Sequence, residues 1–327
     1  LYTDCFQNGV KLEPTTDYTV TLTSLTLVNA ASLNDVVDIV SFDIFAVPDT
    51  VPASTGGTFN GVVTAPGYSS STAGTSNFVA GVNAGNSIAS GGNYNTVVGD
   101  EAGTAITTGD YNTGVGYAAL TANTEGNYNV AVGGLALDAN TTGSANTALG
   151  TSSLGANTTG ANNIAVGLQA LVVNTTGSEN TAMGTYALTA NTTAANNTAV
   201  GYASLNANTT GSNNTAVGVG AGKTSTTTSN ITAIGANALS ANTADQNTAV
   251  GSQALVTNTT GVENVAMGLY ALRYNTTGSD NVGIGDYAIA ANTTASNNTA
   301  VGKYALTANT TASGITGVGY QAGQANT

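Results

Sequence analysis

The sequence predicts an all-β fold: a parallel β-solenoid, or β-roll, that follows a small antiparallel β module at the N-terminal end of the chain. Three observations predict it. A glycine recurs every 17 residues over most of the chain, aliphatic residues keep fixed places relative to it, and the polar residues are mostly Asn, Thr, Ser and Gly. Such a period is typical of repeat proteins whose coils bury apolar side chains by stacking on their neighbours. Gly and β-branched residues in every repeat exclude a helical repeat.

The composition is that of an ordered chain with little charged surface. Charged residues make up 6% of the 327 residues, and there are 42 Gly but no Trp and no His. An ordinary soluble domain is about a quarter charged. Because 41% of the residues are apolar, the low hydrophobicity that marks disordered chains is absent.

The charge excludes two classes of partner. The chain has 4 Lys and Arg against 17 Asp and Glu, a formal net charge of −13. Four scattered cations cannot neutralise a phosphate backbone or an anionic lipid surface, so we expect no nucleic-acid partner. No apolar run of 18 residues occurs, so we also expect no membrane insertion.

The chain divides into three predicted segments. Residues 1–51 form the β module, residues 52–94 are a transition rich in Gly, Ser and Thr, and residues 95–327 form the solenoid shaft. Because the chain begins at Leu1 without a signal-peptide pattern or an initiator Met, we expect a fragment or a processed product.

The predicted β module has one tight turn and alternating strands. Asn8-Gly9 supplies the positive φ values of a two-residue hairpin turn. Residues 17–22 and 35–45 are predicted strands. The single cysteine, Cys5, cannot form an intrachain disulfide and is expected to be a small, half-buried apolar residue.

One glycine marks the repeat and is expected at a corner of the coil, where a positive φ or a missing Cβ is required. The interval between successive positions is 17 residues except from Gly235 to Gly251, where it is 16. The missing residue falls in the turn at residues 243–245, which is therefore expected to face outward. The corner glycines of the first regular coils are Gly116, Gly133, Gly150, Gly167, Gly184 and Gly201.

Two aliphatic positions in each repeat are predicted to form the core. One lies directly before the corner glycine, and the other lies four residues after it. Burial of large aliphatic side chains is the main source of stability that such a coil has. The predicted core residues are Val115, Leu120, Val132, Leu137, Val166, Leu171, Val200 and Leu205.

A third position, directly before the second aliphatic residue, holds only Ala or Ser. Ala119, Ala136, Ala170 and Ala187 are examples. Side chains this small allow another backbone to approach closely. We therefore predict that several copies of the chain, three in number, pack along these small-residue faces.

Asn-Thr-Thr-Gly segments are predicted to form another corner. The Asn tolerates the left-handed region, and its amide can form a ladder with identical neighbours, as at Asn123, Asn140, Asn157 and Asn174. The Thr after it fills its position in every coil from 107 to 310. Turn chemistry is the preferred interpretation of this column. Ice binding is an alternative, although the column lies at a corner rather than along a broad strand face.

The tyrosines scatter over two neighbouring positions. Tyr117 and Tyr202 directly follow the corner glycine, and four others come one residue later. Exposed rings can stack on sugar rings, but amphipathic side chains that cover a corner or a chain–chain seam are the preferred interpretation. The four later tyrosines are Tyr186, Tyr270, Tyr287 and Tyr304.

No catalytic, cofactor-binding or metal-binding residue is predicted, and the chain is not expected to be an enzyme. Without His, the Ser-His-Asp and Cys-His arrangements and most zinc sites are impossible. Acids fill no position of the repeat regularly, so Asp100 with Glu101, and Asp280 with Asp286, are interpreted as solvated surface charge. Residues 218–224 resemble a phosphate-binding loop, but only three residues separate the first Gly from the Gly-Lys pair instead of four.

The repeats resemble those of bacteriophage tail fibres. The Asn-Thr-Ala-Val-Gly segment at 197–201 and the Ala-Leu-Thr-Ala-Asn-Thr-Thr segment at 187–193 carry the resemblance. With a longer period, they are also similar to the head repeats of trimeric autotransporter adhesins. Residues 6–12, 17–18 and 34–40 resemble a small β module of phage fibre proteins. The resemblance covers most of the chain and implies a homotrimeric fibre with an attachment part and a distal host-recognition part.

The expected function is therefore structural. We expect a fibre segment of a phage tail, located in the virion, that spans distance and contributes to attachment to the host surface. Its expected partners are two further copies of itself and a host cell-surface glycan or protein. A bacterial extracellular adhesin or filament subunit is the main alternative, and an ice-binding solenoid is a lesser one.

Overall fold

The computed structural model describes residues 72–325 and, before them, the backbone of six short strands. No helix occurs among these described residues. The chain forms two compact units, residues 1–62 and residues 63–327. The strands are β1 (Tyr2–Gln7), β2 (Val10–Lys11), β3 (Tyr18–Val20), β4 (Leu25–Leu27), β5 (Val37–Phe42), β6 (Tyr68–Ser69), β7 (Phe78–Ala80), β8 (Thr96–Val98), β9 (Thr113–Val115), β10 (Val130–Val132), β11 (Thr147–Leu149), β12 (Ile164–Val166), β13 (Thr181–Met183), β14 (Thr198–Val200), β15 (Thr215–Val217), β16 (Thr232–Ile234), β17 (Thr248–Val250), β18 (Val265–Met267), β19 (Val282–Ile284), β20 (Thr299–Val301) and β21 (Thr316–Val318).

The first unit contains a three-stranded antiparallel sheet in the order β2-β1-β5 and a separate hairpin of β3 and β4. Gln7 pairs with Val10, so two residues turn the chain between β1 and β2, as the Asn-Gly pair predicts. The two other predicted strands are present in shorter form as β3 and β5. The environment predicted for the Cys5 side chain lies outside the described residues.

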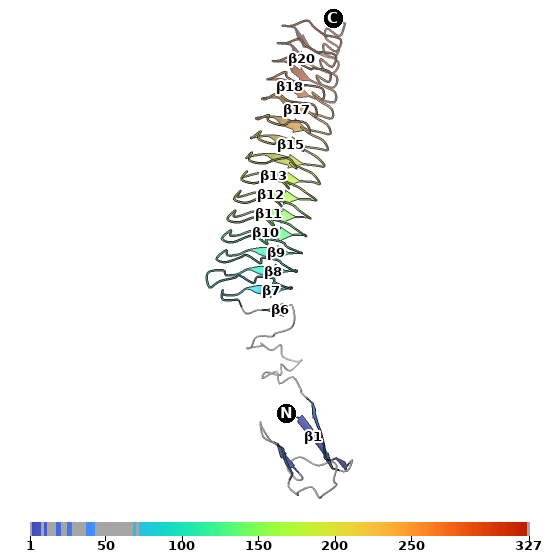
Figure 1. Cartoon of the computed structure of the whole chain (residues 1–327). Helices are drawn as coiled ribbons and strands as arrows, with labels where there is room; N and C mark the ends of the chain where they lie inside the picture. Colours follow the sequence, from blue (N-terminus) through green and yellow to red (C-terminus); the bar gives the residue numbers. More distant parts are fainter. Residues whose placement is uncertain are drawn as a thin grey trace. The chain divides into compact units, whose positions relative to one another are not determined.

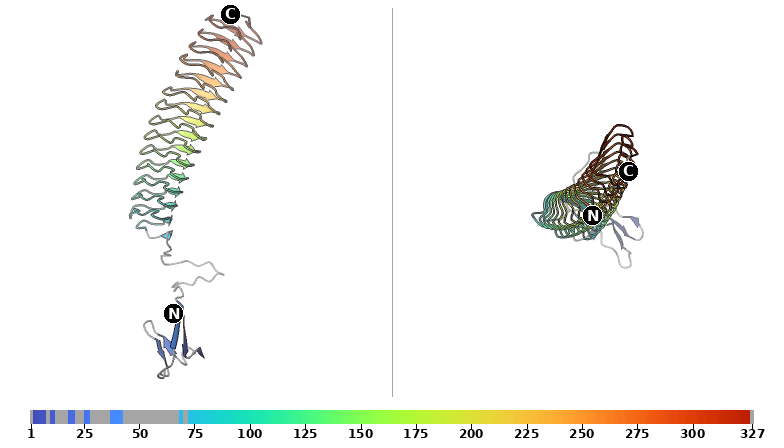
Figure 2. Two further views of the ribbon diagram at one scale, coloured as in Figure 1. Left: turned by 45° about the vertical axis from the view of Figure 1, so that its right-hand side comes forward. Right: turned by 90° about the horizontal axis from the view of Figure 1, so that it is seen from above.

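The second unit is the predicted parallel β-solenoid. The fifteen strands from β7 to β21 stack in register, one strand per coil, as Figure 1 shows. Val130 of β10, for example, pairs with Thr147 of β11, which lies 17 residues later in the chain. Figure 2 shows that the strands form one row along one side of the solenoid, while the turns that connect them form the other sides.

The solenoid begins earlier than the sequence period indicates. Strand β7 pairs in parallel with β8, and Gly81 ends β7 with a φ of 137°, as a corner glycine does. Residues 78–94, expected to be part of a transition, therefore form a coil. The strict period misses this coil because Gly81 lies 18 residues before Gly99.

The prediction for the residue before the corner glycine was wrong. In β10 the middle residue, Ala131, is buried, whereas Val130 and Val132 lie on the outside. Successive side chains of a strand point to opposite faces, so a three-residue strand with Ala inside must place both neighbours outside. The valines that were predicted for the core but lie on the outer face are Val115, Val132, Val166 and Val200.

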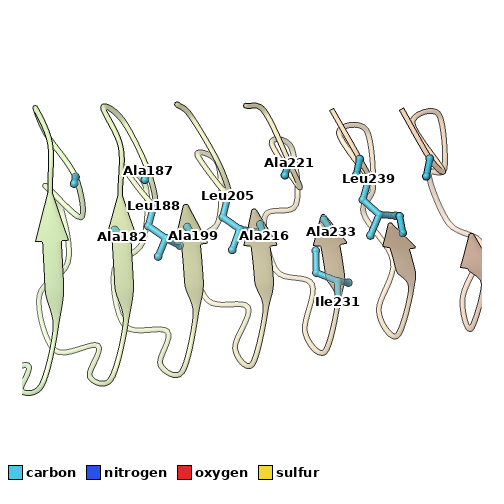
Figure 3. Packing of buried hydrophobic residues seen from close by; sticks show 14 of the residues in the cluster. Ala182, Ala187, Leu188, Ala199, Leu205, Ala216, Ala221, Ile231, Ala233 and Leu239 are labelled. Atoms are coloured by element: carbon cyan, nitrogen blue, oxygen red, sulfur yellow. The ribbon is translucent and has the colours of Figure 1, made fainter. Parts of the chain in front are cut away.

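The second predicted core position is confirmed. Its leucines are fully buried, and in Figure 3 Leu188 and Leu205 extend from the turns toward the strands that carry Ala199 and Ala216. From β10 onward, the alanines at the middle of the strands and these leucines belong to one continuous cluster, whereas Val79 of β7 and Val97 of β8 belong to a second cluster. The confirmed core residues are Leu120, Leu137, Leu171 and Leu205.

The Ala position that was predicted to face another chain lies in the same core. Ala119, Ala136, Ala170 and Ala187 are fully buried within the single chain. The close approach that these small side chains allow is therefore between two sides of one narrow coil. They give no support to an interface between copies.

The corner glycines are confirmed. From Gly116 to Gly201 their φ values lie between 129° and 140°, a region that side chains disfavour. A Cβ atom added at these positions would lie only 2.5–2.7 Å from the carbonyl group of the next corner glycine. Conformation and close stacking therefore both require glycine.

Two columns of buried asparagines run through the interior. In one, Asn140 Nδ2 donates to Asn123 Oδ1 at 2.7 Å and to the Gly143 carbonyl at 2.9 Å. This confirms the predicted amide ladder, although these asparagines do not have a positive φ. In the other, Asn129 Oδ1 accepts the backbone N–H of Asn146 at 3.0 Å. Burial of so many amides is tolerated because each is hydrogen-bonded to the neighbouring coil or turn.

Candidate functional site

The outer strand face consists of the first and third residues of strands β8 to β21. The third residue is aliphatic or Met in every strand, and the first is Thr, Val or Ile. No charged side chain occupies either column of these strands. Met183 is 44% exposed and Ile234 is 38% exposed, so the large side chains remain open to solvent. A continuous apolar surface of this length is typical of an interaction site.

The first column of this face is rich in threonine. From Thr181 to Thr248, five consecutive strands begin with Thr, all of them half-buried. The strands are paired in register, so the Thr side chains repeat at the spacing of the coils. The broad Thr-bearing strand face therefore exists, but it is a different column from the one singled out in the sequence.

The corner threonines use their hydroxyl groups within the solenoid. Thr124 Oγ1 donates to the Thr141 carbonyl at 3.1 Å, and Thr158 Oγ1 donates to the Thr175 carbonyl at 3.0 Å. Each hydroxyl thus joins its own coil to the next. This arrangement supports the interpretation of the column as turn chemistry.

A column of short oxygen-bearing side chains was missed in the sequence. Asp110 Oδ1 accepts the N–H of Asn93 at 2.6 Å, and Ser144 Oγ accepts the N–H of Asn127 at 3.1 Å. Asp245 Oδ1 fills the same role in the shortened coil. The sequence does carry a signal for this column, because Ser, Asp or Asn occurs three residues before most of the strands.

One acid pair named from the sequence, Asp100 with Glu101, also joins coils. Asp100 Oδ1 accepts the N–H of Val82 at 3.0 Å, and Glu101 Oε1 accepts from Asn83 Nδ2 at 3.2 Å. In residues 72–325 no group of three or more Cys, Asp or Glu is placed to hold a metal ion. Desolvation raises the pKa of Asp138, the one partly buried carboxyl whose pKa clearly departs from its usual value in this part of the chain.

The segment that resembles a phosphate-binding loop is an ordinary corner of the solenoid. Strand β15 precedes Gly218, but the following residues form turns and not a helix. Ala221 is fully buried in the core, and Lys223 is exposed. The segment therefore lacks the helix N-terminus on which phosphate binding depends.

Tyrosine rings form two columns along the solenoid, one of them stacked throughout. Tyr94, Tyr111 and Tyr128 stack with centroid distances of 4.9 and 5.1 Å. This column was not predicted from the sequence, because these tyrosines precede the Asn before each strand instead of following the corner glycine.

The second column lies where the sequence predicted it, two residues after the corner glycine. Tyr270, Tyr287 and Tyr304 have centroid distances of 5.0 and 5.3 Å. Two cations accompany it: Arg273 lies against Tyr270, and Lys303 lies against Tyr304. The second column is thus chemically distinct from the first.

In comparisons with protein-family models, with curated proteins and with solved structures, the chain matches none. No part of the described chain forms a helix that has the length and apolarity needed to cross a membrane. The candidate functional surfaces are therefore defined by geometry alone: the outer strand face and the two tyrosine columns.

Proposed function

We propose that the chain is the shaft of a homotrimeric fibre of a phage tail, and that it spans distance and contributes to attachment to the host surface. The outer strand face is the observation that carries this proposal. It runs along the whole stack of strands, and across β8–β21 it contains no charge. Association of copies along this face would remove its aliphatic column from water.

The number of copies and the phage origin come from the resemblance of the repeats to phage fibre repeats. The fold supports a mechanical role because each coil is hydrogen-bonded to the next by strand, asparagine and corner threonine ladders. The face replaces the Ala position as the expected seam between copies. Light scattering on the purified chain should give the mass of a trimer, and a monomeric mass would contradict the proposal.

Replacement of Ile234 by Glu should disrupt association. Ile234 lies in the third column of the outer strand face, and in an assembly its Glu replacement would place like charges close together in an apolar seam. The expected result is a shift from trimer to monomer in light scattering, with the circular dichroism spectrum of the solenoid retained.

Thr227→Glu is the matched control. Thr227 is exposed on a turn of the adjoining coil, so the variant has the same added charge at a site away from the strands. Its mass should remain that of the trimer. Equal effects of the two variants would show that net charge, and not the outer strand face, governs association.

A bacterial extracellular adhesin or filament subunit is the alternative that shares this geometry. The genomic neighbourhood distinguishes the two. Adjacent capsid and tail genes support the phage fibre, whereas a coiled-coil stalk with a membrane anchor in the full-length gene supports the adhesin.

Ice binding is favoured by one observation, the five consecutive threonines at the start of β13 to β17. This function would need the outer strand face to be open in solution, whereas a trimer would cover it. Measurement of thermal hysteresis at high protein concentration decides between them. Hysteresis from a monomeric chain would support the ice-binding solenoid and overturn the fibre proposal.

A further inference from the structure

The coil that starts at Gly268 departs from the repeat at neighbouring outward positions. Arg273 and Tyr274 replace the small or uncharged residues of most coils, and the position of Tyr274 is usually Ala. A shaft needs only regular coils, so clustered departures indicate a local task. Two of the four cations of the whole chain, Arg273 and Lys303, lie within two coils of each other here.

These side chains form one patch. The guanidinium carbon of Arg273 lies 4.3 Å from the ring centroid of Tyr270 and 5.0 Å from that of Tyr274. At the other end, Lys303 Nζ lies 5.2 Å from the ring centroid of Tyr304. The cation–tyrosine patch consists of Tyr270, Arg273, Tyr274, Tyr287, Lys303 and Tyr304.

The tyrosines of the column occupy conformations that bulky residues avoid. Tyr270, Tyr287 and Tyr304 have φ values of 60°, 59° and 62°. Asn and Gly adopt such values more readily, and Asn237 and Gly220 hold the same position in other coils. This left-handed position also accepts Leu135 and Gln169 in other coils, but here tyrosine occupies it in three consecutive coils.

The chemistry of the patch selects one kind of ligand. Tyrosine rings pack against the apolar faces of sugars, and Tyr274 is 48% exposed. The guanidinium of Arg273 lies over two rings, and its N–H groups can bind a carboxylate. Asp286 lies beside Tyr287 in sequence, but its Oδ1 accepts the backbone N–H of Leu269 at 3.1 Å. Elsewhere the acidic chain repels anions, so an anionic ligand should bind at this patch and not along the shaft.

We propose that the cation–tyrosine patch binds a glycan whose pyranose rings carry carboxylate groups. The exposed ring of Tyr274 packs against a sugar face, and Arg273 and Lys303 bind carboxylates at the two ends of the column. This inference rests on the proposed role in attachment and adds the chemical class of the receptor.

Binding of a galacturonic acid tetrasaccharide to the full chain, measured by calorimetry, tests the proposal. The fully methyl-esterified tetrasaccharide keeps the rings but lacks the charge, and it should bind at least about tenfold more weakly. Arg273→Gln and Tyr274→Ala should each weaken binding of the acidic tetrasaccharide by about tenfold.

The chain provides matched controls. Lys223 holds the position of Arg273 in a coil with Gly220 in place of the tyrosine, so Lys223→Gln should leave binding unchanged. Tyr111→Ala removes a ring from the column without cations and should also have no effect.

Four results would overturn the proposal: no binding of the acidic tetrasaccharide, equal binding of its ester, equal losses for Arg273→Gln and Lys223→Gln, or a lower assembled mass of the patch variants. The last would make the patch a seam between copies. A trimeric wild-type chain that binds no acidic sugar would contradict the glycan site and leave the fibre proposal standing.

Discussion

The backbone of each coil depends on residues held at positive φ, and only the corner position is glycine in every coil. Leu120, Leu188 and Leu205 have φ values of 58°, 50° and 46°, in a region that leucine rarely adopts. Burial compensates for this conformation, because these side chains fill the interior between the turns and the strands. The corner glycine has no such compensation, since its φ near 130° places any Cβ against the next coil.

Gly133 and Gly134 provide a direct test, because they are neighbours with opposite requirements. Gly133 has a φ of 134°, and its added Cβ would lie 2.7 Å from the Gly150 carbonyl. Gly133→Ala should lower the free energy of unfolding by about 2–4 kcal/mol. At Gly134 the nearest atom to an added Cβ is 4.0 Å away, so Gly134→Ala should change stability little.

Thermal unfolding followed by circular dichroism measures both variants. A clear fall in the melting temperature is expected for Gly133→Ala alone. Equal melting temperatures for the two variants would show that the corner conformation tolerates a side chain and that the stacking distance is not limiting.

The repeating element of this fold is the coil, and the interior of a coil stays filled even where its core residues change. Gly222 stands where other coils have the core leucine, and Ile231 stands where they have a buried asparagine. Ile231 Cδ1 lies 3.5 Å from the place where a Cβ of residue 222 would be. Gly103 has Ile106 close to it in the same way, at 2.8 Å. Isoleucine therefore fills the space that the missing leucine leaves.

A double-mutant cycle on this coil should reveal strong coupling. Ile231→Asn alone leaves a void beside Gly222, and Gly222→Leu alone overfills the same space. The double variant restores the common coil, because leucine already adopts a φ near 50° at this position in Leu205 and Leu239. The free energy of unfolding of the double variant should be about 1–3 kcal/mol higher than the value expected if the two single effects simply added.

Denaturant titration of the four proteins in the cycle measures this coupling. Leu188→Ala combined with Ile231→Asn is the control pair, since the two residues lie in coils that do not touch, and its effects should add. Additive effects in the Gly222 and Ile231 pair would contradict the volume exchange.

The period and its corner glycine were predictable from the sequence because a strict repeat requires the same backbone in each coil. Which face of the three-residue strands is buried could not be predicted, because a strand of Thr-Ala-Val can bury either the Ala or its two neighbours. The interior is narrow and already holds Leu137 and two asparagine columns, so only Ala131 fits inside β10. The buried asparagines were the missing information, since amides enter a core only when a neighbouring coil satisfies them.

The surfaces of the solenoid could also be predicted only in part, because the sequence does not show which way each side chain points. Tyr270, Tyr287 and Tyr304 share a position in the repeat, so their column was visible in the sequence. The contact of Arg273 with Tyr270 and Tyr274 was not, because it depends on side-chain directions at a corner. The outer strand face was not predicted, because its valines were expected to lie in the core.

At the scale of the whole molecule, the solenoid consists of coils that each contact mainly the coil before and the coil after. Stability in such an array is a sum of coil terms and neighbour terms, so its length can change without a change of fold. The columns of corner glycine, core leucine and buried asparagine must, however, stay in register across any junction.

Deletion of residues 134–201 should therefore be tolerated. It removes four coils and joins Gly133 to Tyr202, a junction equivalent to the natural one between Gly201 and Tyr202. The shaft should shorten by about 19 Å, since each strand spacing contributes about 4.8 Å. The melting temperature should change little, the mass should remain that of a trimer, and the cation–tyrosine patch should bind the acidic tetrasaccharide as before.

Deletion of residues 134–193 is the mismatched control, because its junction falls within a coil and shifts every column against its neighbour. This variant should lose the circular dichroism signal of the solenoid or unfold at a much lower temperature, although it removes fewer residues. Electron microscopy of both variants measures the length of the shaft. If the two deletions were equally tolerated, the ladders between coils would not determine the fold. If both variants unfolded, the shaft would be a single cooperative unit and not an array of coils that depend on their neighbours.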